Sequence, residues 1–252
     1  MKTAFVTMAD SNFLIGCDVL VYSIKKNSPG FFDKCDAKIL LALDKEITAF
    51  RDFDIVHVDP QDYPYFRLDR AKQSPSKLHM FTMTQFDKII FYEADTLCVG
   101  DISDLHCKEQ CDLYACRIYY KSKKAERTYN GKNIFIGDGW VINKNLLTGK
   151  FFQELIKTTQ TGACGDQSIL TKAIEDNRYS SEELSPTYDV VSYIETVKEI
   201  DPYSTYYNYA KMFHFTGIPK PWDCINAISP PKGMIKWWVE TYKQMLESRK
   251  RI

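Results

Sequence analysis

Short apolar strands alternate with helical segments along the amino-terminal part of the chain, and this alternation constrains the fold more than any other feature. The apolar runs typical of strands cover residues 3–8, 38–43, 55–58 and 88–92. The segments with helical spacing between them cover residues 13–27, 47–53 and 76–84. Strands that are joined by helical crossovers form a parallel sheet. The sequence therefore predicts an α/β fold with a mainly parallel central sheet, helices on both faces, and ligands bound beyond the carboxyl ends of the strands.

The pattern changes after residue 105. Strands are expected at 112–118 and 135–143 and helices at 144–159 and 166–174, whereas residues 177–212 show no clear period. A helical stripe of apolar residues occupies the end of the chain. We expect one catalytic domain over residues 1–230, with a carboxy-terminal helix, residues 231–252, docked on it.

Composition and charge exclude several kinds of protein. The 252 residues are 44% apolar and 26% charged, which suits a folded domain with a sizeable core. Lys and Arg (33) balance Asp and Glu (33), so the chain has no overall charge for binding nucleic acid or an anionic membrane. The sequence has neither a signal-peptide core nor a long apolar run, so a soluble cytoplasmic protein is expected. The eight cysteines are widely spread, which favours free thiols.

The sharpest local feature is the triplet Glu93-Ala94-Asp95, which directly follows the apolar strand 88–92. Side chains two residues apart on an extended chain point to the same face, so both carboxylates project at the ligand-binding edge of the sheet. Two anions so close repel each other unless a cation neutralises them or one is protonated. A divalent metal that is also bound by phosphate oxygens meets this need. The same acid-x-acid pattern at 44–46 and 52–54 shows that the triplet alone does not establish a metal site.

A second feature is the segment 214–222, which reads His-Phe-Thr-Gly-Ile-Pro-Lys-Pro-Trp. Gly217 allows a ligand to approach the backbone, and the two prolines fix φ on either side of Lys220. A lysine held in this way suits a phosphate group. His214 can add a nitrogen ligand to a metal that two carboxylates hold, a donor set better suited to Mn²⁺ than to Mg²⁺. The alternative interpretation is a surface turn with a core histidine.

Several segments together resemble one known family. They occur in family order at residues 4–7, 76–81, 86–97, 101–105, 165–168 and 214–222. Over residues 3–225 the chain is similar to the glycogenin and galactinol-synthase-like members of glycosyltransferase family 8. The resemblance implies a single GT-A type domain and a metal-dependent, retaining hexosyltransferase that uses a nucleotide sugar, most often a UDP-hexose.

The resemblance also implies roles for individual residues. The metal ligands are Glu93, Asp95 and His214, with Glu in place of the commoner Asp, and Mn²⁺ is the expected ion with Mg²⁺ as the alternative. The residues beside the reacting sugar are Lys77, Asp138, Asp166 and Gln167. The residues that bind the donor are Thr7, Met8, Phe13, Lys77, Ala94, Gly217 and Lys220. Of these, Phe13 stands where the family packs an aromatic ring on the uracil.

The chain departs from the family at two places. Gly137-Asp138-Gly139 replaces an Asn-Ser-Gly turn that lines the donor sugar, so the identity of that sugar is open. The self-glucosylated tyrosine of glycogenin falls near Thr196, with Tyr193 and Tyr203 out of register. Transfer to a separate glycan, polyol or protein hydroxyl is therefore expected rather than self-glycosylation.

Other functions remain as alternatives. A nucleotidyltransferase or a dinucleotide-dependent redox enzyme normally has a glycine-rich loop after its first strand, and Met8-Ala9-Asp10-Ser11-Asn12 lacks one. A catalytically weak sugar-nucleotide-binding protein does not need the metal ligands and Lys220. The expected partners are a UDP-sugar and a hydroxyl acceptor, without nucleic acid or membrane, and a homodimer is left open.

Overall fold

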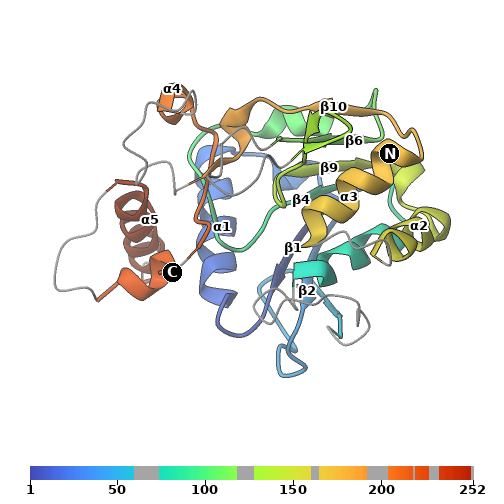
Figure 1. Cartoon of the computed structure of the whole chain (residues 1–252). Helices are drawn as coiled ribbons and strands as arrows, with labels where there is room; N and C mark the ends of the chain where they lie inside the picture. Colours follow the sequence, from blue (N-terminus) through green and yellow to red (C-terminus); the bar gives the residue numbers. More distant parts are fainter. Residues whose placement is uncertain are drawn as a thin grey trace.

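The central sheet has seven strands in the order β10-β6-β9-β4-β1-β2-β3 (Figure 1). The computed structural model describes residues 1–59, 74–117, 128–159, 165–191, 204–217, 219–226 and 233–250. The strands of this sheet are β1 (Thr3–Ala9), β2 (Ala37–Ala42), β3 (Asp54–His57), β4 (Lys88–Phe91), β6 (Leu113–Ala115), β9 (Trp140–Asn143) and β10 (Ser181–Glu183). Strand β9 is antiparallel to both of its neighbours, and the other pairs are parallel. The predicted α/β fold with a mainly parallel sheet is confirmed.

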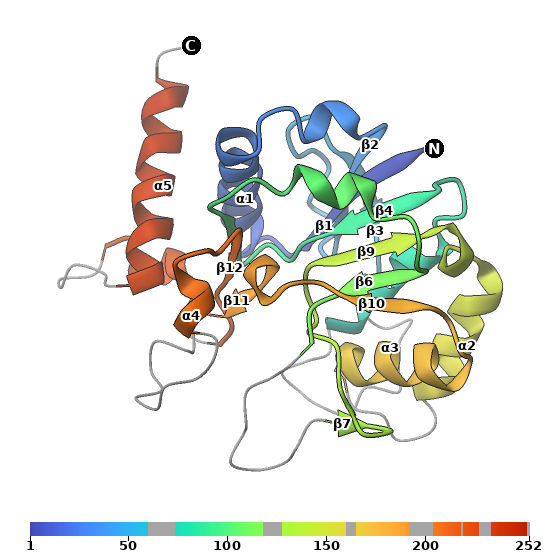
Figure 2. The same ribbon diagram turned by 90° about the horizontal axis from the view of Figure 1, so that it is seen from above.

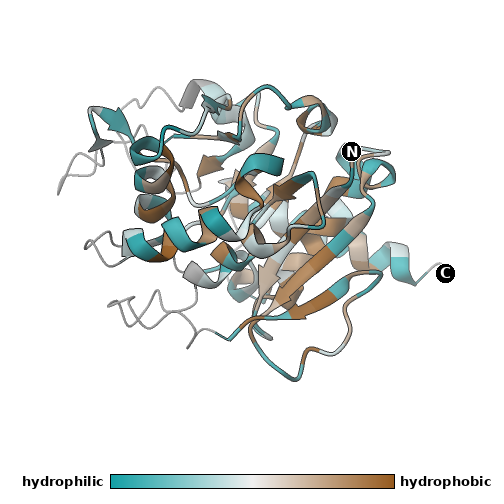
Figure 3. Ribbon diagram, turned by 90° about the vertical axis from the view of Figure 1, so that its right-hand side faces the viewer, coloured by the Kyte–Doolittle hydropathy of each residue, from teal (hydrophilic) through white to brown (hydrophobic). Residues whose placement is uncertain are grey.

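Helices cover both faces of this sheet (Figure 2). Helix α1 (Leu14–Asn27) packs on one face, and α2 (Gly149–Thr159) and α3 (Gly165–Asp176) lie on the other. Successive side chains of β1 therefore enter different cores: Phe5 packs with the α1 side, and Ala4 and Val6 pack with the α3 side. A strand that is covered on both faces is mostly apolar, which explains the run Ala4-Phe5-Val6. The buried hydroxyl of Thr7 lies 3.8 Å from the thiol of Cys17. The strands are mostly brown in the hydropathy colouring, whereas the helices show both colours (Figure 3).

A smaller sheet joins the end of the chain to the main one. Its order is β11 (Val190–Val191), β12 (Met212–His214) and β5 (Thr96–Cys98). Helix α5 (Gly233–Arg249) lies beside α1 in both ribbon views, and its Trp238 is fully buried. The remaining short elements are α4 (Ser204–Tyr207), the hairpin β7 (Thr128–Tyr129) and β8 (Lys132–Asn133), and the 3-10 helices Phe32–Lys34, Ser74–Thr82, Ser103–Cys107, Lys144–Leu146, Pro186–Tyr188 and Pro221–Cys224.

Four expected elements differ in the structure. The predicted helix 144–159 is divided into the 3-10 helix Lys144–Leu146 and α2, which begins at Gly149. The predicted helix 47–53 does not form: residues 50–53 make a turn closed by a bridge between Phe50 and Phe53, and Arg51 adopts a φ of 47°, which a right-handed helix excludes. The predicted strand 135–143 is interrupted, because Gly139 has a φ of 66° and β9 begins only at Trp140. The predicted helix 76–84 is 3-10 rather than α-helical.

Two further expectations concern thiols and membranes. All seven cysteines that the structure describes are free, as the sequence predicted for them. Among the described residues, no helix combines the length and the hydropathy that crossing a bilayer requires.

Candidate active site

The acidic triplet and the distant histidine meet because two short strands pair. Strand β5 starts directly after Asp95, and its Thr96 pairs with His214 of the antiparallel strand β12. The amide of Phe215 donates a hydrogen bond of 2.8 Å to the carbonyl oxygen of Asp95. This pairing places the imidazole beside the carboxylates at the carboxyl end of β4, where the α/β topology predicts a ligand site.

Glu93, Asp95 and His214 form a compact group of possible metal ligands. Nε2 of His214 lies 3.3 Å from a carboxylate oxygen of Glu93 and 3.7 Å from one of Asp95. One ligand atom of each residue lies within 4.8 Å of the other two. Two carboxylates and one imidazole are a donor set that fits a divalent transition metal such as Mn²⁺. The residues that the sequence singled out as metal ligands therefore do converge.

Two lysines neutralise these carboxylates. The ammonium of Lys77, whose side chain is 1% exposed, contacts Glu93 and lies 2.8 Å from Asp166. Lys220 donates to the carboxylate of Asp95 and, at 2.8 Å, to the carbonyl of Phe215. Each acid of the triplet thus has its own cation, and both cations were predicted to bind the donor.

The pKa values of this group reflect the same balance. Burial alone would raise the pKa of Glu93, but the charge of Lys77 and a hydrogen bond with His214 lower the pKa to about 2. Burial would lower the pKa of His214, but Asp189 and Asp95 outweigh it and raise the pKa well above its usual range. Burial would also lower the pKa of Lys77, and Asp166 and Glu93 raise it instead. Without an added metal, the fold holds Glu93 as an anion beside cations.

A second pair of carboxyl groups lies behind the first. Oδ1 of Asp138 accepts a hydrogen bond of 2.6 Å from the amide of Glu93, and Oδ1 of Asp189 lies 3.0 Å from Nδ1 of His214. Both side chains are fully buried, and burial raises the pKa of each. Asp138 is predicted beside the donor sugar; in this structure its carboxyl group faces the backbone of Glu93 and the ring of His214. Asp189 was not singled out, because it stands in the segment without a clear period.

The predicted Asp-Gln pair lies at the start of α3, next to Gly137. A Cβ atom on Gly137 would lie 2.8 Å from Oδ2 of Asp166, 3.2 Å from Nε2 of Gln167 and 3.2 Å from Nζ of Lys77. The carbonyl of Gly137 also accepts a hydrogen bond of 2.7 Å from Lys77. The absence of a side chain at position 137 therefore allows these three predicted residues to gather against one stretch of backbone.

The residues expected at the nucleotide lie around the start of α1. Phe13 packs edge-on against Trp222, with ring centroids 5.0 Å apart, and the ammonium of Lys220 lies 5.6 Å from the Phe13 ring. Thr7 is fully buried beside Cys17, Met8 is half-buried, and Ala94 is buried between the two acids. Gly217 adopts a φ of 87°, with open space where a Cβ would be.

Gly16 was not singled out from the sequence, but it lets α1 approach the triplet. A Cβ at this position would lie 2.5 Å from the carbonyl oxygen of Ala94 and 2.8 Å from the Trp222 ring. A small residue in the first turns of a helix is a weak signal by itself, since only the packed structure shows what lies against it.

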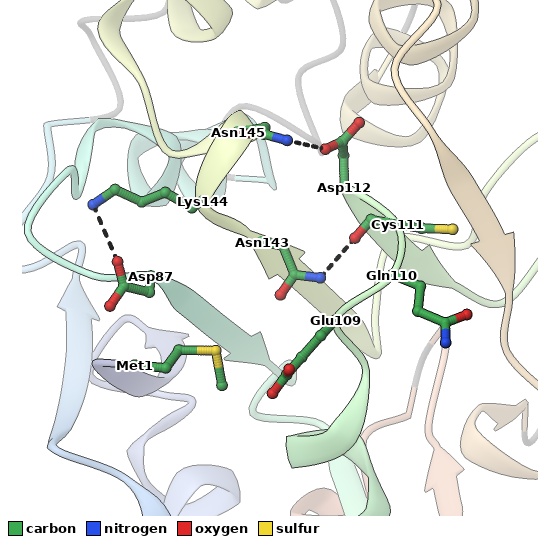
Figure 4. A pocket seen from close by; sticks show the side chains of 9 residues that line it. All are labelled: Met1, Asp87, Glu109, Gln110, Cys111, Asp112, Asn143, Lys144 and Asn145. Atoms are coloured by element: carbon green, nitrogen blue, oxygen red, sulfur yellow. Dashed lines mark hydrogen bonds and ion pairs between the residues drawn. The ribbon is translucent and has the colours of Figure 1, made fainter.

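A pocket lies at the opposite, amino end of β4 (Figure 4). It is lined by Met1, Asp87, Glu109, Gln110, Cys111, Asp112, Asn143, Lys144 and Asn145. Two pairs of its polar groups contact each other: Lys144 lies 3.5 Å from Asp87, and Asn145 donates to Asp112 at 2.7 Å. Because this pocket lies away from the carboxyl ends of the parallel strands, we do not assign the active site here.

Solved glycosyltransferases share this fold. The galactosyltransferase LgtC, in complex with donor and acceptor sugar analogs, matches with a TM-score of 0.67 and 15% identity over 97% of this chain and 95% of its own. GlyE of Streptococcus pneumoniae TIGR4 matches with a TM-score of 0.61 and 18% identity over 98% of this chain and 63% of its own. Mouse xyloside xylosyltransferase 1 matches with a TM-score of 0.51 and 13% identity over 87% of this chain and 100% of its own. The fold is that of the GT-A glycosyltransferases.

A comparison of the sequence with family models identifies the family within the GT-A glycosyltransferases. The model of glycosyl transferase family 8 matches residues 5–226, so the chain belongs to that family and is a glycosyltransferase. The family predicted from the sequence segments is thereby confirmed. In a comparison with curated protein sequences, none matches this chain.

Proposed function

We propose that this protein is a metal-dependent, retaining glycosyltransferase that transfers a hexose from a UDP-sugar to the hydroxyl of a separate acceptor. The observation that carries the proposal is the convergence of Glu93, Asp95 and His214 within 4.8 Å at the carboxyl end of the sheet. The fold likeness to LgtC, which was solved with donor and acceptor sugar analogs, supports a site of the same kind.

Glu93, Asp95 and His214 would hold the ion, with Mn²⁺ preferred over Mg²⁺ because of the nitrogen ligand. When bound, such an ion supplies a Lewis acid that stabilises negative charge on a departing diphosphate. Lys220 provides a second positive charge at the same edge, and its contact with the carbonyl of Phe215 helps to fix its position. A preorganised cation of this kind stabilises the charge that develops as the leaving group departs.

Asp166 and Gln167 would lie on the sugar side of the site. Lys77 joins the two sides, since its ammonium contacts Asp166 as well as Glu93. In this position Asp166 can act as a nucleophile in a double displacement, or stabilise positive charge on the anomeric carbon during attack from the same face. Retention of configuration is compatible with both routes.

The residues that bear on self-glycosylation, Tyr193, Thr196 and Tyr203, lie outside the described part of the chain. The proposal of a separate acceptor therefore rests on the sequence, which has Thr196 where glycogenin carries its acceptor tyrosine.

The proposal is tested by measuring release of UDP from a panel of UDP-sugars, with and without Mn²⁺ and without an acceptor. A transferase of this kind shows slow, manganese-dependent hydrolysis of its preferred donor, and Asp95→Ala abolishes it. The matched control is Asp87→Ala, which removes a carboxylate at the other end of β4. Release of UMP instead of UDP would indicate cleavage between the phosphates and contradict the proposal. The absence of any manganese-dependent release would favour a binding protein.

A further inference from the structure

His214 lies between two sets of carboxyl groups, one on each ring nitrogen. Its Nε2 faces Glu93 and Asp95 at 3.3 and 3.7 Å. Its Nδ1 faces Asp189 at 3.0 Å and Asp138 at 3.9 Å. A neutral imidazole binds a metal through one nitrogen and carries its proton on the other, so the group facing the second nitrogen decides which one is free.

The fold fixes the position of Asp189 from both sides along the chain. After it, β11 pairs in parallel with β12, with Val191 opposite His214. Before it, the 3-10 helix Pro186–Tyr188 is capped by the hydroxyl of Ser185. The amide of Lys211 also donates to the carbonyl of Thr187 at 2.7 Å. The carboxyl group is therefore held against the imidazole by backbone pairing and not by a flexible loop.

Packing alone does not explain an acid at this position. The side chain of Asp189 is fully buried, and its Oδ2 has no hydrogen-bond partner among the described residues. Burying a carboxyl group disfavours folding unless its hydrogen bonds return the cost, and an apolar side chain of the same size would fill the space more favourably. The hydrogen bond with Nδ1 of His214 is the interaction that accounts for an acid at this position.

We propose that Asp189 is a positioning residue for the metal site: it accepts a hydrogen bond from the Nδ1–H of His214 and so directs the Nε2 lone pair toward the ion. Asp138 helps to hold the metal ligand Glu93 in place, because it accepts a hydrogen bond from the amide of Glu93. Carboxylates that hold a metal-bound histidine in this way typically change metal affinity by about 10- to 100-fold when they are removed. This inference rests on the metal site of the proposed function.

The test measures binding of Mn²⁺ alone to the full chain, by the electron paramagnetic resonance signal of the free ion. Asp189→Leu removes the acceptor and keeps the volume, and Asp189→Ala serves the same purpose with a smaller side chain. We expect the dissociation constant to rise by about 10- to 100-fold in either variant. Asp189→Asn keeps an oxygen that accepts a hydrogen bond from Nδ1–H, and its affinity is expected to stay within about 10-fold of the wild type.

Pulsed electron paramagnetic resonance adds a second measurement, whose result a purely structural role of Asp189 would not change. The nitrogen coupling of bound Mn²⁺ reports whether His214 is a ligand; it is expected in the wild type and in Asp189→Asn and lost in Asp189→Leu. Asp104→Asn is the matched control. Asp104 contacts Lys211 and Tyr188, the residue that precedes Asp189, and within the described part of the chain it forms no hydrogen bond or ion pair with His214. Its affinity for Mn²⁺ is expected to equal that of the wild type.

Three results would overturn the inference: unchanged affinity and coupling in Asp189→Leu and Asp189→Ala, an equal loss in Asp189→Asn, or an equal loss in Asp104→Asn. If the wild type itself binds no Mn²⁺, the proposed function fails, and the inference fails with it. The wild-type measurement therefore separates the two failures.

Discussion

The two ends of the central sheet both carry clusters of charged side chains, but they hold them differently. At the carboxyl end, Asp95, Asp138, Asp166 and Asp189 are buried, and Lys77 is buried among them. At the amino end, Asp87 and Lys144 form an ion pair whose side chains are 42% and 53% exposed. Exposed pairs contribute about 0 to 1 kcal/mol to stability, whereas buried charges must be compensated inside the fold. Lys88, at the amino end of β4, is also buried, but it is a single cation. The comparison teaches that several buried carboxyl groups gathered together, and not charge by itself, distinguish the candidate site.

The carboxyl end also has more acids than bases within reach. Glu93, Asp95 and Asp166 pair with Lys77 and Lys220. The two acids behind them, Asp138 and Asp189, lie 3.9 and 3.0 Å from Nδ1 of His214. Burial raises the pKa of both of these acids, so the excess is one of carboxyl groups and not of net negative charge. At the amino end, Lys144 pairs with Asp87, and Asn145 pairs with Asp112.

The largest effect is expected from removing one carboxylate at each end of β4. Asp95→Ala should reduce manganese-dependent turnover by at least about 10³-fold, because a Lewis acid contributes several kcal/mol to the transition state. Asp87→Ala should leave turnover unchanged. The measurement is kcat with the preferred UDP-sugar. Equal loss of activity in both variants would contradict the difference in function between the two ends of the sheet.

The next effect concerns one lysine from each end. Lys220→Ala should lower kcat by about 10²- to 10³-fold, since it removes one preorganised electrostatic donor. Lys144→Ala removes the exposed partner of Asp87 and should change neither kcat nor KM. Steady-state kinetics on both variants checks this. A Lys220→Ala enzyme that loses only donor affinity, with kcat intact, would show that the lysine binds the ground state alone.

A smaller effect is expected on stability where α1 approaches the triplet. Gly16→Ala places a methyl group 2.5 Å from a backbone oxygen of Ala94, so the helix or the triplet must shift. We expect a loss of about 1 to 3 kcal/mol in the free energy of unfolding. Gly149→Ala is the control, because nothing lies within 4 Å of the added carbon. Urea unfolding of both variants is the measurement, and equal stabilities would contradict the close approach.

The smallest effect is a pH dependence at the far end of α1. Hydrogen bonds from Ser28 and Ser103 lower the pKa of Asp101 to about 2. Since this folded-state pKa is below the usual value of about 3.9, Asp101 stabilises the fold above about pH 4 and loses this contribution as the pH falls toward 2. Asp101→Asn should therefore be less stable than the wild type at neutral pH, by less than about 1 kcal/mol because the group is exposed.

The measurement for Asp101 is the free energy of unfolding of both proteins between pH 2 and 7. The difference between them should shrink as the pH falls. A difference that stays constant over this range would show that the hydrogen bonds do not depend on the charge of Asp101.

Much of the fold followed from local patterns in the sequence. The buried parallel strands and α1 lie close to their predicted positions, because apolar runs and helical periods report burial directly. The helix expected at 47–53 failed because Arg51 adopts a positive φ, which side-chain pattern does not reveal. Likewise, the strand expected from 135 begins at Trp140, since the turn at Gly139 depends on a backbone angle.

Some residues of the candidate site were predictable from the sequence, and others were not. Glu93 and Asp95 were found from their place after a buried strand, and His214 and Lys220 from a rigid proline-flanked loop and the family resemblance. Asp189 could not be found, because its role comes from the pairing of β11 with β12. Short strands of two or three residues leave almost no periodic signal, so contacts that depend on them become visible only in three dimensions.

The central claim is that Glu93, Asp95 and His214 bind one divalent ion that holds a diphosphate. The most direct test is a crystal grown with Mn²⁺ and UDP, with data collected at a wavelength where manganese scatters anomalously. The account predicts one anomalous peak, from a manganese ion bound by these three side chains and by the phosphate oxygens of UDP. A UDP molecule bound without an ion at these residues, or a peak only at the other end of the sheet, would contradict it.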